Sequence, residues 1–269
     1  MRRGIFVLAA VVVVAFVPGP AGAITYGEPD SPNPHRNVGA LIADWDDENP
    51  GPEQLCSGTL ISSRYFLTAG HCTAFLEAID VTQAWVSFDA DVDPVTSSTT
   101  LLSGTWVTHP EFGHDSADSK DLAVFRFNKA VIGLTPARLP TAGLFTQMKS
   151  AGTLNGQLFT NVGYGVHEPE IGGGPPTWPY DGERWRSVSE FNGLNQAWLR
   201  LSQNSATSDG GTCFGDSGGP NFIGAGASET DVIGSITVTG DAMCLATNVT
   251  YRLDTRVARD FLGQFVSLP

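Results

Sequence analysis

Positive charge is scarce in this chain of 269 residues, which has 15 lysines and arginines against 28 aspartates and glutamates. The formal net charge is −13 at pH 7. Nucleic acids and anionic membranes attract proteins through basic surfaces, so this balance argues against both as partners. An acidic surface of this kind favours solubility and disfavours acidic substrates.

Long apolar runs are also missing beyond the N-terminus. Met1-Arg2-Arg3 precedes an apolar run from Ile5 to Val17, and small residues end at Ala23. This pattern predicts a secretory signal peptide over residues 1–23, and the run is too short to span a bilayer as a helix. A membrane anchor and twin-arginine export are the alternatives. Signal removal would leave residues 24–269, a secreted chain with a net charge of −15, because the signal carries two arginines and no acids.

Cysteine is limited to four residues, Cys56, Cys72, Cys213 and Cys244. None has the two-to-four-residue spacing of zinc ligands, which argues against a zinc site. An even number in an exported chain predicts disulfides, and four cysteines allow three pairings.

We therefore expect no metal and no cofactor. Asp89, Asp91 and Asp93 alternate as calcium ligands can, but Pro94 and Thr100 stand where an EF-hand loop needs glycine and glutamate. A looser calcium site remains an alternative.

Glycine and proline are scattered between short apolar or alternating runs, which predicts an all-β sandwich or barrel. The expected strands are 55–61, 65–68, 84–88, 101–107, 122–127, 158–164, 198–201, 232–238 and 249–253. One terminal helix is expected, because Val257, Phe261, Leu262 and Phe265 share a helical face, with Asp254 or Thr255 as its cap. The segment 168–181 contains Gly172-Gly173-Gly174-Pro175-Pro176 and is expected to be a loop.

Three segments contain candidate catalytic residues. They are Leu67-Thr68-Ala69-Gly70-His71-Cys72, Asp121-Leu122-Ala123-Val124 and Gly215-Asp216-Ser217-Gly218-Gly219-Pro220. A serine hydroxyl needs an adjacent base to become a nucleophile, and a glycine-rich turn can present two amides to an oxyanion. Their order and local sequence resemble those of the chymotrypsin-like (trypsin-fold) serine peptidases, over nearly the whole mature chain.

The resemblance implies two six-stranded antiparallel β-barrels with a C-terminal α-helix. The first half, residues 24–137, would carry His71 and Asp121, and the second, residues 138–269, would carry Ser217. Ser217 would be the nucleophile, His71 the general base and then acid, and Asp121 the residue that orients His71. The amides of Gly215 and Ser217 would form the oxyanion hole. The other four histidines (His35, His109, His114 and His167) are expected to lie on surface loops.

The same resemblance pairs Cys56 with Cys72 and Cys213 with Cys244. Val162-Gly163-Tyr164-Gly165 is similar to a Gly-Trp-Gly segment of the family but lacks the cysteine often found nearby, which suggests a lean, bacterial-type member.

In the family a freed N-terminal amine, usually of isoleucine, pairs with the acid before the nucleophile. The corresponding pair here is Ile24 and Asp216, and Ile24 directly follows the predicted cleavage site. Signal removal alone would then create the activating terminus. The alternative is that Ile24 merely begins the mature chain.

The family's specificity pocket has its floor six residues before the serine. That residue here is Gly211, beside Thr212, so the carboxylate that selects Arg or Lys is missing and a neutral P1 residue is expected. Thr239 and Val249 would narrow the pocket and favour a small or medium apolar P1 residue, while Thr237 and Val238 would pair with substrate backbone. If that alignment of the pocket neck is wrong, an aromatic P1 residue is the alternative.

The expected function is a secreted serine endopeptidase that acts on proteins or peptides as a monomer and can be bound by proteinaceous inhibitors. A catalytically silent homologue that serves as a binding module is the alternative. An α/β-hydrolase esterase is excluded by the order of the three residues, since those enzymes run Ser, Asp, His.

Overall fold

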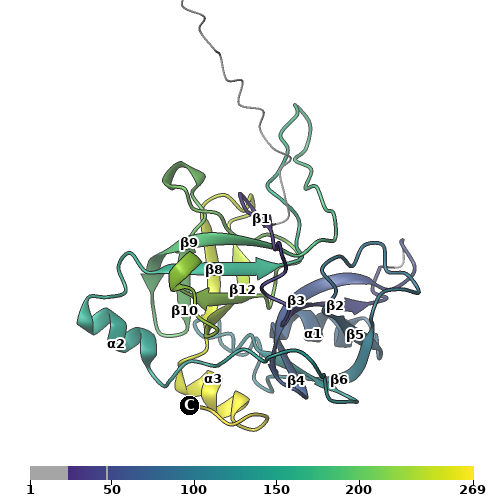
Figure 1. Ribbon diagram of the computed structural model, residues 1–269, viewed down its shortest axis with the longest axis horizontal. Helices are drawn as coiled ribbons and strands as arrows, with labels where there is room; N and C mark the ends of the chain where they lie inside the picture. Colours follow the sequence, from purple (N-terminus) through teal and green to yellow (C-terminus); the bar gives the residue numbers. More distant parts are fainter. Residues whose placement is uncertain (1–23, 47) are drawn as a thin grey trace, which may run out of the picture.

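The computed structural model describes residues 24–46 and 48–269. The predicted signal peptide, residues 1–23, lies outside the described residues. Within the described part, no helix is long and apolar enough to cross a membrane. Strand is the main element, and the strands form two six-stranded antiparallel barrels that lie side by side, as the family resemblance implies (Figure 1).

The first barrel closes through its strands in the order β2-β3-β4-β7-β6-β5. Their bounds are β2 Val38–Ala43, β3 Glu53–Ser62, β4 Tyr65–Thr68, β5 Ala84–Ser87, β6 Leu102–Thr108 and β7 Ala123–Phe127. Phe66, Phe125 and Phe127 fill its centre, with edge-to-face ring pairs at centroid distances of 5.4 Å and 6.4 Å. Helix α1 (Gly70–Ala78) follows β4 almost directly, so the first barrel fixes the position of His71.

The second barrel runs in the order β9-β10-β13-β12-β11-β8 and closes by pairing β8 with β9. Its strands are β8 Leu158–Gly163, β9 Trp185–Leu194, β10 Trp198–Ser202, β11 Pro220–Ile223, β12 Ile233–Gly240 and β13 Thr247–Arg252. The short strand β1 (Glu28–Pro29) adds to the outside of β9. Helix α2 (Leu144–Ala151) precedes β8, and two 3₁₀ turns cover Ser205–Thr207 and Gly226–Ser228.

Part of the interior of the second barrel is polar. Asn161 on β8 donates to the hydroxyls of Ser187 and Ser189 on β9, at 3.0 Å and 2.7 Å. Its carbonyl accepts from Asn221 on β11 at 2.8 Å, and Ser235 on β12 continues the chain of contacts at 3.0 Å. All five side chains are buried, and their mutual hydrogen bonds offset the loss of contact with water.

Helix α3 (Arg256–Leu262) closes the chain as predicted, and Thr255 is its cap, with its side-chain oxygen accepting from the Ala258 amide at 3.2 Å. Asp254 does not cap the helix but binds Arg252 and the amide of Phe145 instead. The helix packs on the first barrel: the rings of Phe261 and His109 lie 4.9 Å apart. The terminal helix therefore contributes to holding the two barrels together.

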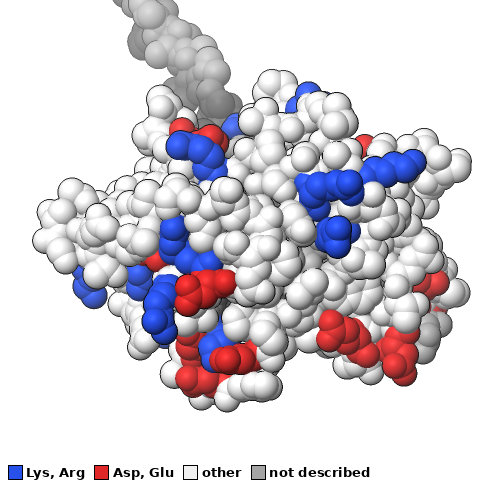
Figure 2. Space-filling view, turned by 90° about the horizontal axis from the view of Figure 1, so that it is seen from below, with Lys and Arg blue, Asp and Glu red and all other residues white. Residues whose placement is uncertain are grey.

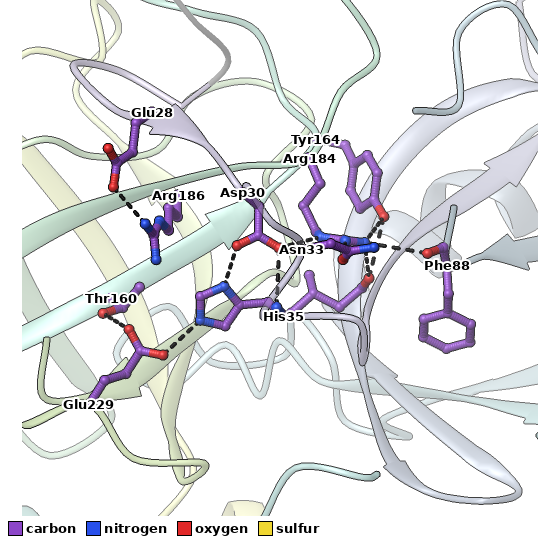
Figure 3. A network of polar contacts seen from close by, with 11 residues as sticks. Glu28, Asp30, Asn33, His35, Phe88, Thr160, Tyr164, Arg184, Arg186 and Glu229 are labelled. Carbon is purple, nitrogen blue, oxygen red and sulfur yellow. Dashed lines mark hydrogen bonds and ion pairs between the residues drawn. The ribbon is translucent and has the colours of Figure 1, made fainter. Parts of the chain in front are cut away.

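A buried polar network also joins the barrels (Figure 3). Arg184 is almost fully buried and donates to Asp30 at 2.9 Å, to the Val38 carbonyl at 3.1 Å and to the Tyr164 hydroxyl at 2.7 Å. On the other side of Asp30, the His35 ring lies between Asp30 (2.6 Å) and Glu229 (2.7 Å). The network thus connects the segment after β1 with β2 in one barrel and with the second barrel.

The surface is sparsely charged, in keeping with a sequence in which 16% of residues carry a charged side chain. On the face seen in Figure 2, uncharged residues cover most of the area and both signs of charge are present. Several basic residues form a short row at the upper right of this view, and others lie beside acidic residues at the left.

Candidate functional site

His71 is held by Asp121 through two hydrogen bonds. His71 lies in the first turn of α1, where backbone amides have no partner within the helix. Asp121, just before β7, accepts from the His71 amide at 2.8 Å with one oxygen and contacts ring Nδ1 at 3.0 Å with the other. Asp121 is buried, while about a third of the His71 side chain is exposed. The carboxylate therefore both completes the helix terminus and fixes the ring, leaving Nε2 for other contacts.

Ser217 lies with His71 on the wall of one cavity of about 420 Å³. The carbonyl of Ser217 accepts from the Ser57 amide at 2.9 Å, which ties the serine to β3 of the first barrel. Within the described part of the chain, no hydrogen bond joins the His71 ring to the Ser217 hydroxyl. Such contacts often tighten only when substrate binds.

The turn before Ser217 leaves two backbone donors free. Gly215 has a φ of +93°, and a Cβ there would lie 2.9 Å from the Cα of Gly165, so only glycine fits without strain. Its carbonyl accepts from Gln54 Nε2 at 2.8 Å and from the Ser57 hydroxyl at 2.9 Å. No hydrogen bond among the described residues uses the amides of Gly215 or Ser217. An oxyanion hole needs such donors.

The two disulfides are Cys56–Cys72 and Cys213–Cys244, the pairing that the family resemblance implies. Cys56–Cys72 ties α1 to β3 beside His71. Cys213–Cys244 joins the segment before Ser217 to the turn after β12. His71 also lies close to both sulfurs of the first bridge, but oxidised sulfur lacks the thiolate that binds a metal.

Asp216 is completely buried and has only backbone donors. Its oxygens accept from the amides of Gly165 and Cys213, each at 2.8 Å, and no ion pair reaches it from any described residue. Burial raises its pKa from 3.8 to about 7, despite these two hydrogen bonds. A Cβ on Gly163 or Gly165 would lie within 2.6 Å of this carboxyl group. The two glycines noted in the sequence are therefore required by Asp216.

Ile24 is also fully buried, where it packs with Trp185 on β9. The carbonyl of the next residue, Thr25, accepts from the Gly211 amide at 2.9 Å. Ile24 and Asp216 are not joined by any contact that the structure records among the described residues.

The cavity contains most of the expected specificity residues. Its lining includes Thr212 and the stretch 237–241, which covers Thr237, Val238 and Thr239. Gly211 and Val249 do not belong to this lining, although both lie in the described part of the chain. Asp241 does belong to it, and its carboxylate accepts from three amides of the turn 245–247. Burial raises the pKa of Asp241, but those hydrogen bonds outweigh it and the net shift is downward.

Sequence reasoning missed four residues that contribute to this site. Gln54 supports Gly215, Gln203 lies behind Thr212, and Trp178 packs edge-to-face on the exposed Phe214 at 5.5 Å. Phe214 alone carried a signal, because it stands three residues before Ser217. The other residues are distant in sequence and lie in no motif.

The expectation of four surface histidines is wrong for two of them. His35 and His167 are 5% and 2% exposed. His35 is enclosed by Asp30, Glu229 and a stacked Phe222 ring at 5.4 Å, whereas His167 packs against Trp185 at 5.3 Å. Proline and acidic neighbours made both segments resemble solvated loops.

No curated protein matches the chain. The family model described as Trypsin matches residues 37–261, which include His71, Asp121 and Ser217. The chain belongs to the trypsin family of serine peptidases.

Proposed function

We propose that this chain is a secreted endopeptidase that hydrolyses proteins or peptides through His71, Asp121 and Ser217. The observation that carries the proposal is the pair of hydrogen bonds from Asp121 to His71, with Ser217 on the wall of the same cavity as the ring. Family membership supports it, because peptidases of this family act on proteins.

In the proposed reaction, His71 Nε2 takes the Ser217 proton as the hydroxyl oxygen attacks the substrate carbonyl. The free amides of Gly215 and Ser217 stabilise the resulting oxyanion. His71 then gives its proton to the leaving amine, and an acyl-enzyme forms. A water molecule, activated by the same ring, releases the acid and restores Ser217. Asp121 stabilises the imidazolium throughout.

A fluorophosphonate probe tests this mechanism, because it reacts only with an activated serine. We expect the mature chain to label at Ser217 and Ser217→Ala not to label. If folded wild-type protein fails to label, the alternative function is favoured, a catalytically silent homologue that binds other proteins.

We further propose a neutral P1 residue that is small or apolar. No carboxylate stands at Gly211, and the Asp241 carboxylate is already bound by three backbone amides. A cleavage profile on a mixed peptide pool measures the P1 preference. Cleavage mainly after Arg or Lys would contradict the proposal.

Activation is proposed to follow from removal of residues 1–23, which would free the Ile24 amine to pair with Asp216. A buried carboxylate without a cation is costly, and Asp216 has none among the described residues. The pairing would raise the pKa of the amine above about 8, so its stabilising effect is present at neutral pH and lost as the pH rises through the raised value. Adding one residue before Ile24 should abolish activity, and unchanged activity would reject the pairing.

A further inference from the structure

Gln203 directly follows β10, and its side chain is completely buried behind the cavity that contains His71 and Ser217. Its backbone amide donates to the Ala246 carbonyl at 3.0 Å. Its side-chain oxygen accepts from the Thr212 amide at 2.5 Å, and Thr212 lines the cavity. The glutamine is thereby fixed at both ends to segments that border the cavity.

Gln203 occupies the space against Gly211. A Cβ built on Gly211 would lie 2.0 Å from the Gln203 Oε1 atom and 2.3 Å from its Cγ atom. A Cβ on Gly240, which lines the cavity, would lie 3.8 Å from Gln203 Nε2. The glycine at 211 therefore makes room for the glutamine rather than for a substrate side chain, and the glutamine fills the space between Gly211 and the backbone of Gly240.

Gln203 does not itself line the cavity but supports its floor from behind Thr212 and Gly240, and this supporting layer is polar. Its Nε2 group is buried and has no partner among the described residues, and the same is true of the Oδ1 atom of Asn248. Asn248 is the strand partner of Gly240. A long apolar side chain that reached this floor would leave the amide donor without an acceptor, which is unfavourable.

We propose that Gln203 is a specificity-determining residue, which closes the pocket and restricts P1 to short uncharged side chains such as Ala, Ser and Thr. This inference rests on the proposed function. The sequence predicted that Gly211 forms the pocket floor, whereas in the structure the Gln203 side chain fills the space against Gly211. Leu, Met and Phe are excluded by length and by the polarity of the floor.

Two variants distinguish the effect of the volume of the Gln203 side chain from the effect of its hydrogen bond to the Thr212 amide. Gln203→Ala and Gln203→Met both lose the contact with the Thr212 amide, but only alanine opens the space, because methionine is about as long as glutamine. We expect wild type to cleave after Ala or Ser with a kcat/KM at least tenfold above that for Leu or Met. Gln203→Ala should gain at least tenfold for Leu and Met relative to Ala, and Gln203→Met should keep the wild-type order.

Fluorophosphonate labelling and melting curves accompany each profile. Wild type that labels but cleaves freely after Leu or Phe overturns this inference alone, and so does an equal shift in both variants. Wild type that does not label overturns the proposed function as well. If Gln203→Ala does not fold, the wild-type cleavage profile tests the inference, because cleavage after Leu or Phe as efficient as after Ala would contradict it.

Discussion

Both carboxylate oxygens of Asp121 are bound to His71, one to the backbone amide and one to ring Nδ1. A single carboxylate thus fixes the position of α1 and the orientation of the imidazole together. A substitution at Asp121 can therefore preserve the contact with the helix amide while it disturbs the contact with the imidazole ring.

In Asp121→Asn, the side-chain oxygen can still accept from the His71 amide, so the fold should survive. The amide nitrogen then faces Nδ1 and favours the wrong tautomer for proton transfer from Ser217. We expect kcat to fall by roughly 10⁴-fold with a melting temperature close to that of wild type. Asp115→Asn, an exposed acid in the same loop, is the control and should retain full activity.

Gln54 provides a second prediction, because it reaches from β3 to the Gly215 carbonyl at 2.8 Å. Gln54→Ala removes one of the two side chains that hold this peptide, and the Ser57 hydroxyl remains. We expect kcat to fall about tenfold with little change in KM, since this contact orients Gly215, whose own amide is a proposed oxyanion donor. The exposed Gln147→Ala serves as control, and a KM effect without a kcat effect would contradict a positioning role.

Most of the expected strands correspond closely to observed ones, as in β4 (Tyr65–Thr68), but β1, β11 and the wholly buried, apolar β2 (Val38–Ala43) were not expected. Strand β9 was not anticipated, because two of its inward positions are Ser187 and Ser189, which bind Asn161 instead of forming an apolar face. Helix α1 was missed for a different reason. Its start depends on Asp121, fifty residues away, and on the disulfide to Cys56, neither of which leaves a local pattern.

In the candidate site, too, some residues could be predicted from the sequence and others could not. The catalytic candidates stand in short motifs whose chemistry is readable from residue type. Gln203 was not predictable, because its role arises only when the end of β10 meets Gly211 from behind. The proposed specificity therefore depends on contacts that only the structure shows, whereas the proposed reaction class can be inferred from the sequence motifs.

The buried Asp216 yields a prediction for chains that retain residues before Ile24. Its pKa, raised by burial to about 7, means that the folded state holds a proton that the unfolded state releases near 3.8. Stability is then greatest below pH 4 for this group and falls as the pH rises to about 7, by about 4 kcal/mol. Melting curves of a chain with a retained extension should show this fall, and Asp216→Asn should remove it.

The mature chain supplies the matched comparison. A free Ile24 amine that pairs with Asp216 would stabilise the charged carboxylate, so the fall between pH 4 and pH 7 should be absent. If the mature and extended chains show the same pH dependence, the proposed pairing does not form.

The network around His35 gives the last prediction. Burial lowers the pKa of His35, but its hydrogen bonds to Asp30 and Glu229 outweigh this and raise it overall. The stabilisation is therefore complete below about pH 6.5 and is lost as the pH rises through the raised value. Burial raises the pKa values of Asp30 and Glu229, but bonding to His35 outweighs it and lowers both, so their contribution is lost as the pH falls through the lowered values.

Replacing His35 with phenylalanine would preserve the stacking on Phe222 but leave two carboxylates without their shared donor. Because Asp30 is buried and retains only Arg184 as a charged partner, we expect His35→Phe to lower the free energy of unfolding by about 3 kcal/mol at pH 6. The deficit should shrink above neutral pH, where the wild-type histidine loses its proton. Asp231→Asn breaks the exposed pair with Arg138 and should change stability by no more than about 0.5 kcal/mol at either pH. Urea titrations at pH 6 and pH 8.5 measure both variants, and a deficit for His35→Phe that is the same at the two pH values would show that the proton on His35 contributes nothing.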